Sequence, residues 1–220
     1  MSYVVKEIFY TLQGEGRNAG RPAVFCRFSG CNLWTGREVD RAKAICQFCD
    51  TDFVGVGSDG GRFESPDALA DAVLARWPGV RYGRADGGRP LVVCTGGEPL
   101  LQLDVAAIDA LHARGFQVAV ETNGTRHAPA GIDHLCVSPK AGAPLVLTRG
   151  DELKLVYPQS HADGDPARYT SLAFTEFVLQ PLDAGDDATS RANVRAALAY
   201  CLEHPQWRLG LQTHKLLDIR

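Results

Sequence analysis

Short β-rich runs alternate with helical patterns along most of the chain, and this alternation limits the fold more than any other feature of the sequence. Strands that alternate with helices favour an α/β fold with a mostly parallel sheet, because each parallel connection needs a long crossover. The expected strands span 23–29, 91–94, 116–121, 134–137, 152–156, 174–179 and 208–212, and the expected helices span 66–76, 105–114 and about 191–203.

The boundaries of two expected helices follow from their capping residues. Ser65 is a good N-cap, and Pro66 suits the first helical position. Gly115 stops the helix that contains residues 105–114.

The length of 220 residues fits one domain, residues 1–220, and allows a substantial core. A complete eight-unit β/α barrel typically takes about 250 residues. We therefore expect an incomplete, partial TIM-like barrel with mostly parallel strands.

Charge and hydropathy exclude several classes of protein. A formal net charge of −3 argues against a general nucleic-acid binder or a membrane-surface protein. No apolar run is long enough to cross a bilayer, and the first residues lack the pattern of a secretory signal. We expect a cytoplasmic protein that binds neither nucleic acid nor membrane.

Four polar or glycine-rich motifs directly follow expected strands. Ligands bind at the carboxyl ends of strands in parallel sheets and barrels. Glycine, proline and asparagine also mark ordinary turns, but four such motifs in succession favour one binding site. The motifs are Thr95–Glu98, Glu121–Asn123, Ser138–Lys140 and Gln180–Pro181.

Three of the seven cysteines, Cys31, Cys46 and Cys49, cluster in a weakly periodic segment at about 30–61. An odd number of cysteines does not suit a pure disulfide framework, and clustered cysteines in a reducing compartment indicate metal ligands. The remaining cysteines lie in apolar surroundings and are expected to be buried small hydrophobes. They are Cys26, Cys94, Cys136 and Cys201.

The spacing Cys31-x14-Cys46-x2-Cys49 suits two kinds of metal site. Three thiolates can hold a cubane iron–sulfur cluster and leave one iron with the open position that catalysis requires. A structural zinc site built from the same cysteines and a fourth ligand is the alternative, and the spacing alone leaves both open.

The cysteine spacing, with Phe48 just before the last cysteine, resembles the radical S-adenosylmethionine (SAM) superfamily, whose usual motif is Cys-x3-Cys-x2-Cys. The enlarged first gap, together with Leu12–Gly16 and Cys49-Asp50-Thr51, resembles one family within it, the 7-carboxy-7-deazaguanine synthases (QueE). The likeness extends over nearly the whole chain. Its further motifs are Phe25–Arg27, Gly96–Pro99, Glu121–Gly124, Ser138–Lys140 and Gln212–Lys215.

The resemblance implies that Cys31, Cys46 and Cys49 hold a 4Fe–4S cluster and that SAM binds its open iron. Glycines allow close backbone approach, and backbone carbonyls or a carboxylate can accept hydrogen bonds from the SAM ammonium. The residues implied for SAM are Phe48 against adenine, Gly96, Gly97 and Glu98 at the ammonium, Glu121 or Asn123 at the ribose, Ser138, Pro139 and Lys140 at the carboxylate, and Gln180.

The family converts 6-carboxy-5,6,7,8-tetrahydropterin to 7-carboxy-7-deazaguanine with loss of ammonia, a step of queuosine and 7-deazapurine biosynthesis. The resemblance implies that Arg27 binds the substrate carboxylate, which a guanidinium can hold bidentately. Glu15 can accept two hydrogens from the amino-pyrimidinone edge, and Gln13 or nearby backbone can donate to its carbonyl. The other residues implied for the substrate are Leu12, Gly14, Thr95 and His204, with His214 nearby.

The family also depends on magnesium, which prefers hard oxygen ligands. The resemblance favours Thr51 as a direct Mg²⁺ ligand and Asp50 as a supporting residue. Local backbone hydrogen bonds that shape the loop are the alternative role for this pair.

Two other functions remain as alternatives. One is an activase that makes a glycyl radical on a partner protein, and the other is a zinc-stabilised binding module without catalysis. For the synthase we expect a pterin substrate, an external electron donor such as flavodoxin, and a homodimer. Between Arg17 and Lys43, six basic residues stand against two acidic ones, which suits anionic ligands or a solvated basic face.

Overall fold

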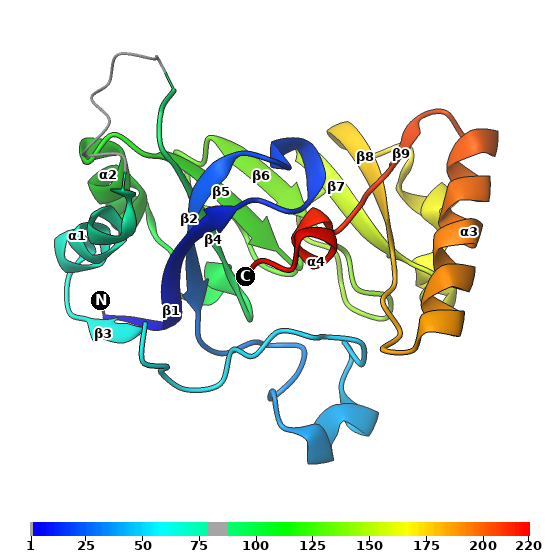
Figure 1. The fold of residues 1–220 in the computed structure, drawn as a ribbon, viewed down its shortest axis with the longest axis horizontal. Coiled ribbons are helices and arrows are strands. Elements are labelled where there is room, and N and C mark those ends of the chain that lie inside the picture. The colour runs from blue at the N-terminus through cyan, green and yellow to red at the C-terminus, as the bar shows by residue number, and fades with distance from the viewer. Residues whose placement is uncertain (1, 79–87) are drawn as a thin grey trace.

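A continuous, unclosed sheet of nine strands runs through the computed structural model, which describes residues 2–78 and 88–220 (Figure 1). Its order is β3-β1-β2-β4-β5-β6-β7-β8-β9, with parallel pairing from β2 to β9. The predicted partial TIM-like barrel is confirmed. The strands are β1 Tyr3–Leu12, β2 Pro22–Phe28, β3 Gly61–Phe63, β4 Leu91–Gly96, β5 Gln117–Thr122, β6 His134–Val137, β7 Arg149–Tyr157, β8 Ala173–Pro181 and β9 Trp207–Leu209, and the helices are α1 Pro66–Arg76, α2 Val105–Ala113, α3 Asp187–Glu203 and α4 Thr213–Leu217.

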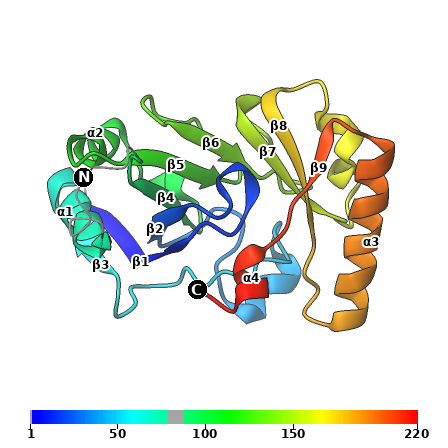
Figure 2. The same cartoon turned by 45° about the horizontal axis from the view of Figure 1, so that its top comes forward.

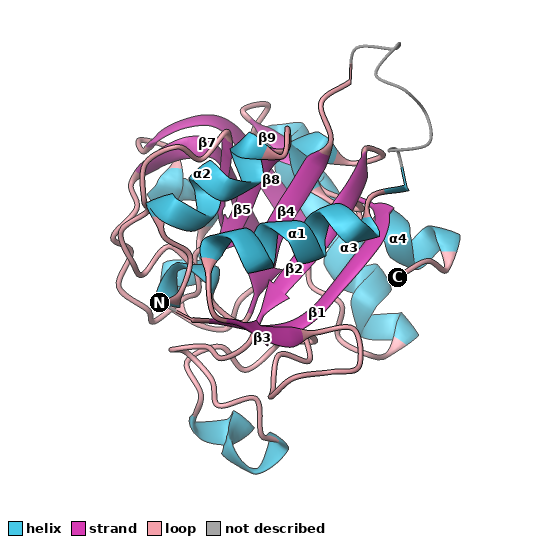
Figure 3. Cartoon of the chain, turned by 90° about the vertical axis from the view of Figure 1, so that its left-hand side faces the viewer, coloured by secondary structure: helices cyan, strands magenta, loops and turns pink. Residues whose placement is uncertain are grey.

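Side chains of the central strands alternate between the two faces of the sheet. Val92, Cys94 and Val118 face outward into the core that α1 and α2 cover (Figure 3). Phe25, Val93 and Ala119 face the other way and form a smaller apolar layer inside the barrel. Burial of each such Val or Phe contributes about 1.5–3 kcal/mol, so both faces of these strands stabilise the sheet.

The helix boundaries follow mainly from capping. Ser65 accepts a hydrogen bond from the Ala68 backbone N–H and starts α1 where the sequence predicts. Gly115, at φ 87°, follows the end of α2. α3 begins at Asp187 rather than near residue 191, because Asp186 caps it through the Thr189 N–H at 2.9 Å. Figure 2 shows α3 lying along β8 and β9.

Three elements were not expected from the sequence: β1, β3 and α4. β1 lies antiparallel to both β2 and β3 and extends one edge of the sheet. The predicted strand 208–212 is wrong in its second half. β9 ends at Leu209, and Gln212 instead precedes α4 and turns its side chain toward Glu15.

The segment between β2 and β3 is largely irregular, as predicted, and extends below the sheet in Figure 1. It contains one 3₁₀ turn, Glu38–Lys43. Trp34 and Phe53 are buried in it and meet edge to face at 5.6 Å, so the segment has a small apolar core of its own. No helix in the described part of the chain is both long and apolar enough to span a membrane.

Candidate active site

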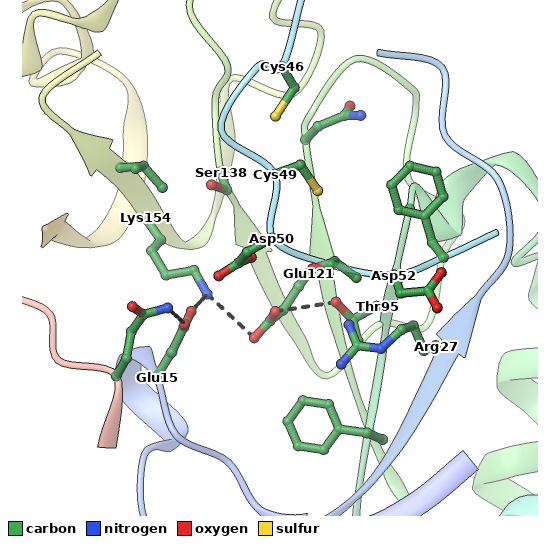
Figure 4. Close-up of a pocket in the computed structure, with 18 of the residues that line it drawn as sticks. Glu15, Arg27, Cys46, Cys49, Asp50, Asp52, Thr95, Glu121, Ser138 and Lys154 are labelled. Atoms are coloured by element: carbon green, nitrogen blue, oxygen red, sulfur yellow. Dashed lines mark hydrogen bonds and ion pairs between the residues drawn. The ribbon is translucent and has the colours of Figure 1, made fainter. Parts of the chain in front are cut away.

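A cavity of about 450 Å³ is lined by the carboxyl ends of the parallel strands, by the segment between β2 and β3, and by the segment that carries α4 (Figure 4). The predicted strand-end motifs therefore meet at one place. This cavity combines thiols, carboxylates and cations from distant parts of the sequence.

Cys31, Cys46 and Cys49 all line this cavity. A hydrogen bond from Cys46, together with the Thr51 backbone N–H and the charge of Lys140, lowers the pKa of the Cys49 thiol to about 6 against the opposing effect of burial. The same hydrogen bond raises the pKa of Cys46, and burial raises that of Cys31. Among the described residues, no three His, Cys, Asp or Glu side chains gather closely enough around one point to hold a single metal ion.

The other four cysteines lie outside the cavity, and all seven are free thiols. Burial raises the pKa of Cys26, Cys94 and Cys136, which makes them poor nucleophiles and ligands. Cys201 is half-buried beside Trp207 and the rest of the α3 core, rather than fully buried. Cys26, Cys94 and Cys136 are thus buried small hydrophobes, as predicted, whereas Cys201 is only partly covered.

Gly96 and Gly97 allow the end of β4 to pass close to the segment that leads to Cys31. A Cβ at Gly96, where φ is 126°, would lie 2.2 Å from the Phe28 carbonyl oxygen. One at Gly97 would lie 2.0 Å from the Gly30 carbonyl oxygen. Both glycines also line the cavity, so the pair serves close packing and an open cavity wall together.

Glu98 does not reach the cavity, which corrects the expectation that its carboxylate accepts a hydrogen bond from SAM. It is fully buried, and burial raises its pKa. Its oxygens accept hydrogen bonds from the Thr122 hydroxyl at 2.7 Å and from the Leu100 and Asn123 backbone N–H groups. Glu98 therefore ties the end of β4 to the end of β5.

A partly buried ionic network forms one wall of the cavity. It consists of Glu15, Glu121 and Lys154, which Figure 4 labels, together with Gln13 and Gln212. The Lys154 ammonium lies 2.5 Å from Glu15 Oε2 and 3.5 Å from Glu121 Oε1. The two glutamine side chains donate to the carboxylates, Gln212 to Glu15 at 2.8 Å and Gln13 to Glu121 at 2.9 Å.

Burial acts to raise the pKa of Glu15, but the charge of Lys154 and its hydrogen bond outweigh this and lower it to about 2. The pKa of Lys154 is raised, because the attraction of Glu121 and Glu15 exceeds its own desolvation. Glu15 and Lys154 are thus both charged, and the network sets two carboxyl groups against one ammonium. It leaves an excess of acceptors toward the cavity.

Arg27 supplies positive charge at another wall of the cavity. Its Nε donates to Glu7 Oε1 at 2.8 Å, and Glu7 also pairs with Arg220. Both guanidinium groups lie over the Phe9 ring, that of Arg220 at 4.5 Å. Within the described residues no other hydrogen bond holds the Arg27 guanidinium, so its outer edge is free to bind an anion.

Near the thiols, Lys140 donates to the Ser138 hydroxyl at 2.6 Å and lies 6.0 Å from the centre of the Phe48 ring. Asp50 and Thr51 line the same region, and Asp50 accepts a hydrogen bond from Lys215 at 3.2 Å. The surroundings of the thiols are therefore both cationic and rich in oxygen atoms.

Comparison with known proteins identifies this arrangement, although no protein-family model matches the chain. A 7-carboxy-7-deazaguanine synthase of Caulobacter vibrioides is 63% identical over 220 residues, which cover 100% of both chains. One of Bradyrhizobium diazoefficiens is 60% identical over 221 residues, again with 100% of both covered. The crystal structure of QueE from Escherichia coli matches with a TM-score of 0.65 and 26% sequence identity, over 96% of this chain and 94% of that one. The chain belongs to the 7-carboxy-7-deazaguanine synthase family.

Membership in the 7-carboxy-7-deazaguanine synthase family confirms the resemblance found in the motifs. The chain is an enzyme, a radical SAM lyase of this family, and the family implies a 4Fe–4S cluster and SAM. Neither the activase nor the zinc-stabilised module is favoured.

Most residues expected to serve the synthase reaction line the cavity. Pro139 does not, and His204 is far from that role: its ring stacks on Tyr200 at 4.0 Å and its Nδ1 is 3.0 Å from the Tyr200 carbonyl oxygen. The expected residues that do line it are Leu12, Gln13, Gly14, Glu15, Arg27, Cys31, Cys46, Phe48, Cys49, Thr51, Thr95, Gly96, Gly97, Glu121, Asn123, Ser138, Lys140, Gln180 and His214.

Sequence reasoning missed Lys154, which holds the ionic network of this synthase-family cavity together. The signal was present in the strand Glu152-Leu153-Lys154-Leu155, where charged and apolar residues alternate. Such alternation usually marks a solvent-facing side. Here the charged face points into the barrel, and Leu153 and Leu155 pack on the other side in the α3 core.

Proposed function

We propose that the 450 Å³ cavity carries out the reaction of the family, the conversion of 6-carboxy-5,6,7,8-tetrahydropterin to 7-carboxy-7-deazaguanine with loss of ammonia. The observation that carries this proposal is the meeting of three kinds of group in one cavity. Three thiols, a free guanidinium edge and an acceptor-rich ionic network all line it. Each matches one part of the required chemistry.

The thiols of Cys31, Cys46 and Cys49 would hold the 4Fe–4S cluster. Their common cavity supports this role, as does the cation Lys140, which favours the thiolate form of Cys49. Gln180 supports a nearby SAM site, because the residue lines the cavity and its buried Oε1 accepts no hydrogen bond from the described residues. When bound, cluster and SAM supply the radical that abstracts a substrate hydrogen atom.

The side chains around SAM would then act by position and charge. Lys140 with Ser138 would hold its carboxylate, and Phe48 would contact the adenine ring. Glu121 is engaged with Gln13 and Lys154, which favours a role at the boundary between SAM and substrate. Asn123 already donates to Asn32 Oδ1 at 3.1 Å, so it would reach the ribose only by exchanging this partner.

The pterin would lie between Arg27 and the ionic network. Arg27 would bind the substrate carboxylate through the outer edge of its guanidinium. Glu15 would accept hydrogen bonds from the amino-pyrimidinone edge, which is rich in donors, and Gln13 would position the ring. Lys154 holds the pKa of Glu15 well below its usual range, so that this carboxylate remains an acceptor at neutral pH.

Mg²⁺ would be bound by the Thr51 hydroxyl and by the substrate carboxylate, with Asp50 in support. The hydrogen bond from Lys215 to Asp50 favours this supporting role over direct ligation. Turnover further requires an external electron donor such as flavodoxin. We expect a homodimer in the cytoplasm, where reducing conditions preserve free thiols.

The test is anaerobic reconstitution with iron and sulfide, followed by incubation with SAM, a reductant and the carboxylated tetrahydropterin. We expect 7-carboxy-7-deazaguanine and ammonia without any partner protein substrate. SAM cleavage without this product would refute the substrate assignment, and a reconstituted protein without iron would refute the cluster assignment.

A further inference from the structure

A second cavity, of about 10 Å³, lies behind the ionic network and is bordered by Glu15, Glu121, His134 and Glu152. Glu152 belongs to β7 and is 1% exposed. Its Oε1 is buried and accepts no hydrogen bond from the described residues. A buried carboxylate oxygen normally has a donor, and a cavity of roughly 10–15 Å³ is the size that holds one water molecule.

The other oxygen of Glu152 holds the turn that follows Glu15. Its Oε2 accepts the Arg17 backbone N–H at 2.8 Å and lies 3.4 Å from His134 Nε2. Gly16 is left-handed at φ 64°, and a Cβ there would lie 2.2 Å from Glu152 Oε1. The Glu152 carboxylate therefore packs directly against Gly16 and Arg17, the residues that determine where the Glu15 side chain lies in the large cavity.

Glu176 of β8 offers a natural comparison, because it is paired with Glu152 across the two strands. It contacts the same turn from outside, with its Oε1 3.4 Å from Arg17 Nε. Its side chain is 18% exposed, against 2% for Glu152. Burial acts to raise the pKa of Glu152, but the hydrogen bonds from His134 and Arg17 outweigh it, so this pKa is lowered and the group is ionised.

We propose that Glu152 is a positioning residue for Glu15, and that the small cavity binds one water molecule that donates a hydrogen bond to Glu152 Oε1. Asn18 and His134 border the same cavity and provide further polar partners for the water. With a hydrogen bond to each of its oxygens, the Glu152 carboxylate fixes the Gly16–Arg17 turn. The Glu15 carboxylate is thereby held in a fixed position relative to Lys154 and the substrate. This role rests on the proposed part of Glu15 in pterin recognition.

The matched pair Glu152→Gln and Glu176→Gln tests the proposal. In Glu152→Gln the amide places a donor where the carboxylate oxygen meets the water, so we expect the KM for the pterin to rise about tenfold with kcat changed less than about twofold. In Glu176→Gln both constants should stay within about twofold of the wild type. Iron content and substrate-free SAM cleavage should be unchanged in both variants.

Two further measurements keep the result interpretable. Calorimetric binding of 6-carboxypterin needs no turnover, so weaker binding to Glu152→Gln supports the positioning role even if the proposed reaction fails.

If Glu152→Gln does not fold, Gly16→Ala displaces the same turn and should weaken pterin binding likewise. A high-resolution crystal structure should show an ordered water at Glu152 Oε1. A small cavity without an ordered water overturns the proposal. Normal pterin binding by both Gly16→Ala and Glu152→Gln overturns it as well.

Discussion

The two ends of the large cavity are held in different ways. At one end, Glu121 and Lys154 belong to strands β5 and β7, and both bond to side chains of the segment that directly follows β1. At the other end, Cys46 and Cys49 lie on the irregular segment between β2 and β3, whose ion pairs are exposed, such as Arg41 with Glu38. Strands of the sheet therefore hold the end that contains the ionic network, whereas an irregular segment holds the end that contains the thiols.

The two ends of the cavity therefore differ in how much their side chains contribute to the stability of the fold. A charged network buried among strands contributes to the fold itself, and loss of one partner leaves an uncompensated charge. A ligand loop depends instead on the group that it binds, because metal binding and local ordering are coupled. Variants at the two ends should therefore fail in different assays.

The largest effect is expected from the thiols. Cys49→Ala should abolish iron incorporation and SAM cleavage, because three ligands are the minimum for a site-differentiated cluster, while the unfolding midpoint of the metal-free protein barely changes. Cys31→Ala and Cys46→Ala should also lose the cluster. Iron and sulfide analysis with a urea titration measures both effects.

Cys201→Ala is the control for these thiol variants, since this half-buried cysteine lies outside the cavity. It should retain full iron content. Loss of iron in this variant would mean a fourth thiolate ligand and no open iron.

Next in size is Lys154→Met, which leaves Glu15 and Glu121 without their buried counter-charge. We expect a loss of about 3–5 kcal/mol in the free energy of unfolding. Lys215→Met is the control, because Lys215 bridges Asp50 and Asp183 at a partly exposed site and should cost less than about 1 kcal/mol. Urea denaturation measures the unfolding free energy of both variants. Equal losses in Lys154→Met and Lys215→Met would contradict the difference between the two ends of the cavity.

Arg27→Ala should act on binding rather than on radical formation. Without a guanidinium for its carboxylate, 6-carboxypterin should bind more weakly by about 2–5 kcal/mol in calorimetry. Slow, uncoupled SAM cleavage should persist. Arg76→Ala, which removes an arginine paired with Asp59, serves as the control. Normal pterin binding by Arg27→Ala would mean that the substrate lies in another orientation.

The smallest effect is expected from Thr51→Ala. Loss of the hydroxyl should lower turnover by about tenfold and flatten its dependence on added magnesium, while the cluster and SAM still bind. Thr35→Ala is matched in chemistry and lies in the same segment, but its hydroxyl pairs with Asp40. It should respond to magnesium like the wild type, and an unchanged response in Thr51→Ala as well would exclude Thr51 as a ligand.

The sequence predicts those parts of the molecule that depend on local chemistry or on repeated pattern. Ser65 and Pro66 set the start of α1 by capping, and alternating elements set the parallel sheet. The cysteine cluster is predictable because its three side chains share one metal-binding chemistry. The strand-end motifs are predictable because parallel strands end at one edge of the sheet. The same reasoning did not find β1, which pairs antiparallel with the next strand, β2, on one side and with β3, which is distant in sequence, on the other.

The errors in the site share a physical cause. Lys154 and Glu98 are both buried and ionisable, and only tertiary partners decide whether such groups face a ligand or other residues of the protein. Lys154 meets two carboxylates across the barrel, whereas Glu98 is fully occupied by Thr122 and backbone N–H groups. His204 shows the same limit, because its stacking on Tyr200 within α3 is invisible from its residue type.

The layered interior of the barrel has a consequence for redesign. Arg27, Thr95 and Glu121 stand two residues further along the strands that carry Phe25, Val93 and Ala119. Arg27, Thr95 and Glu121 line the cavity. The other three residues form the inner apolar layer, of which Phe25 also borders the cavity. Substitution of Arg27, Thr95 and Glu121 can therefore alter which heterocycle the barrel accepts. The apolar layer that preserves the shape of the barrel would remain unchanged.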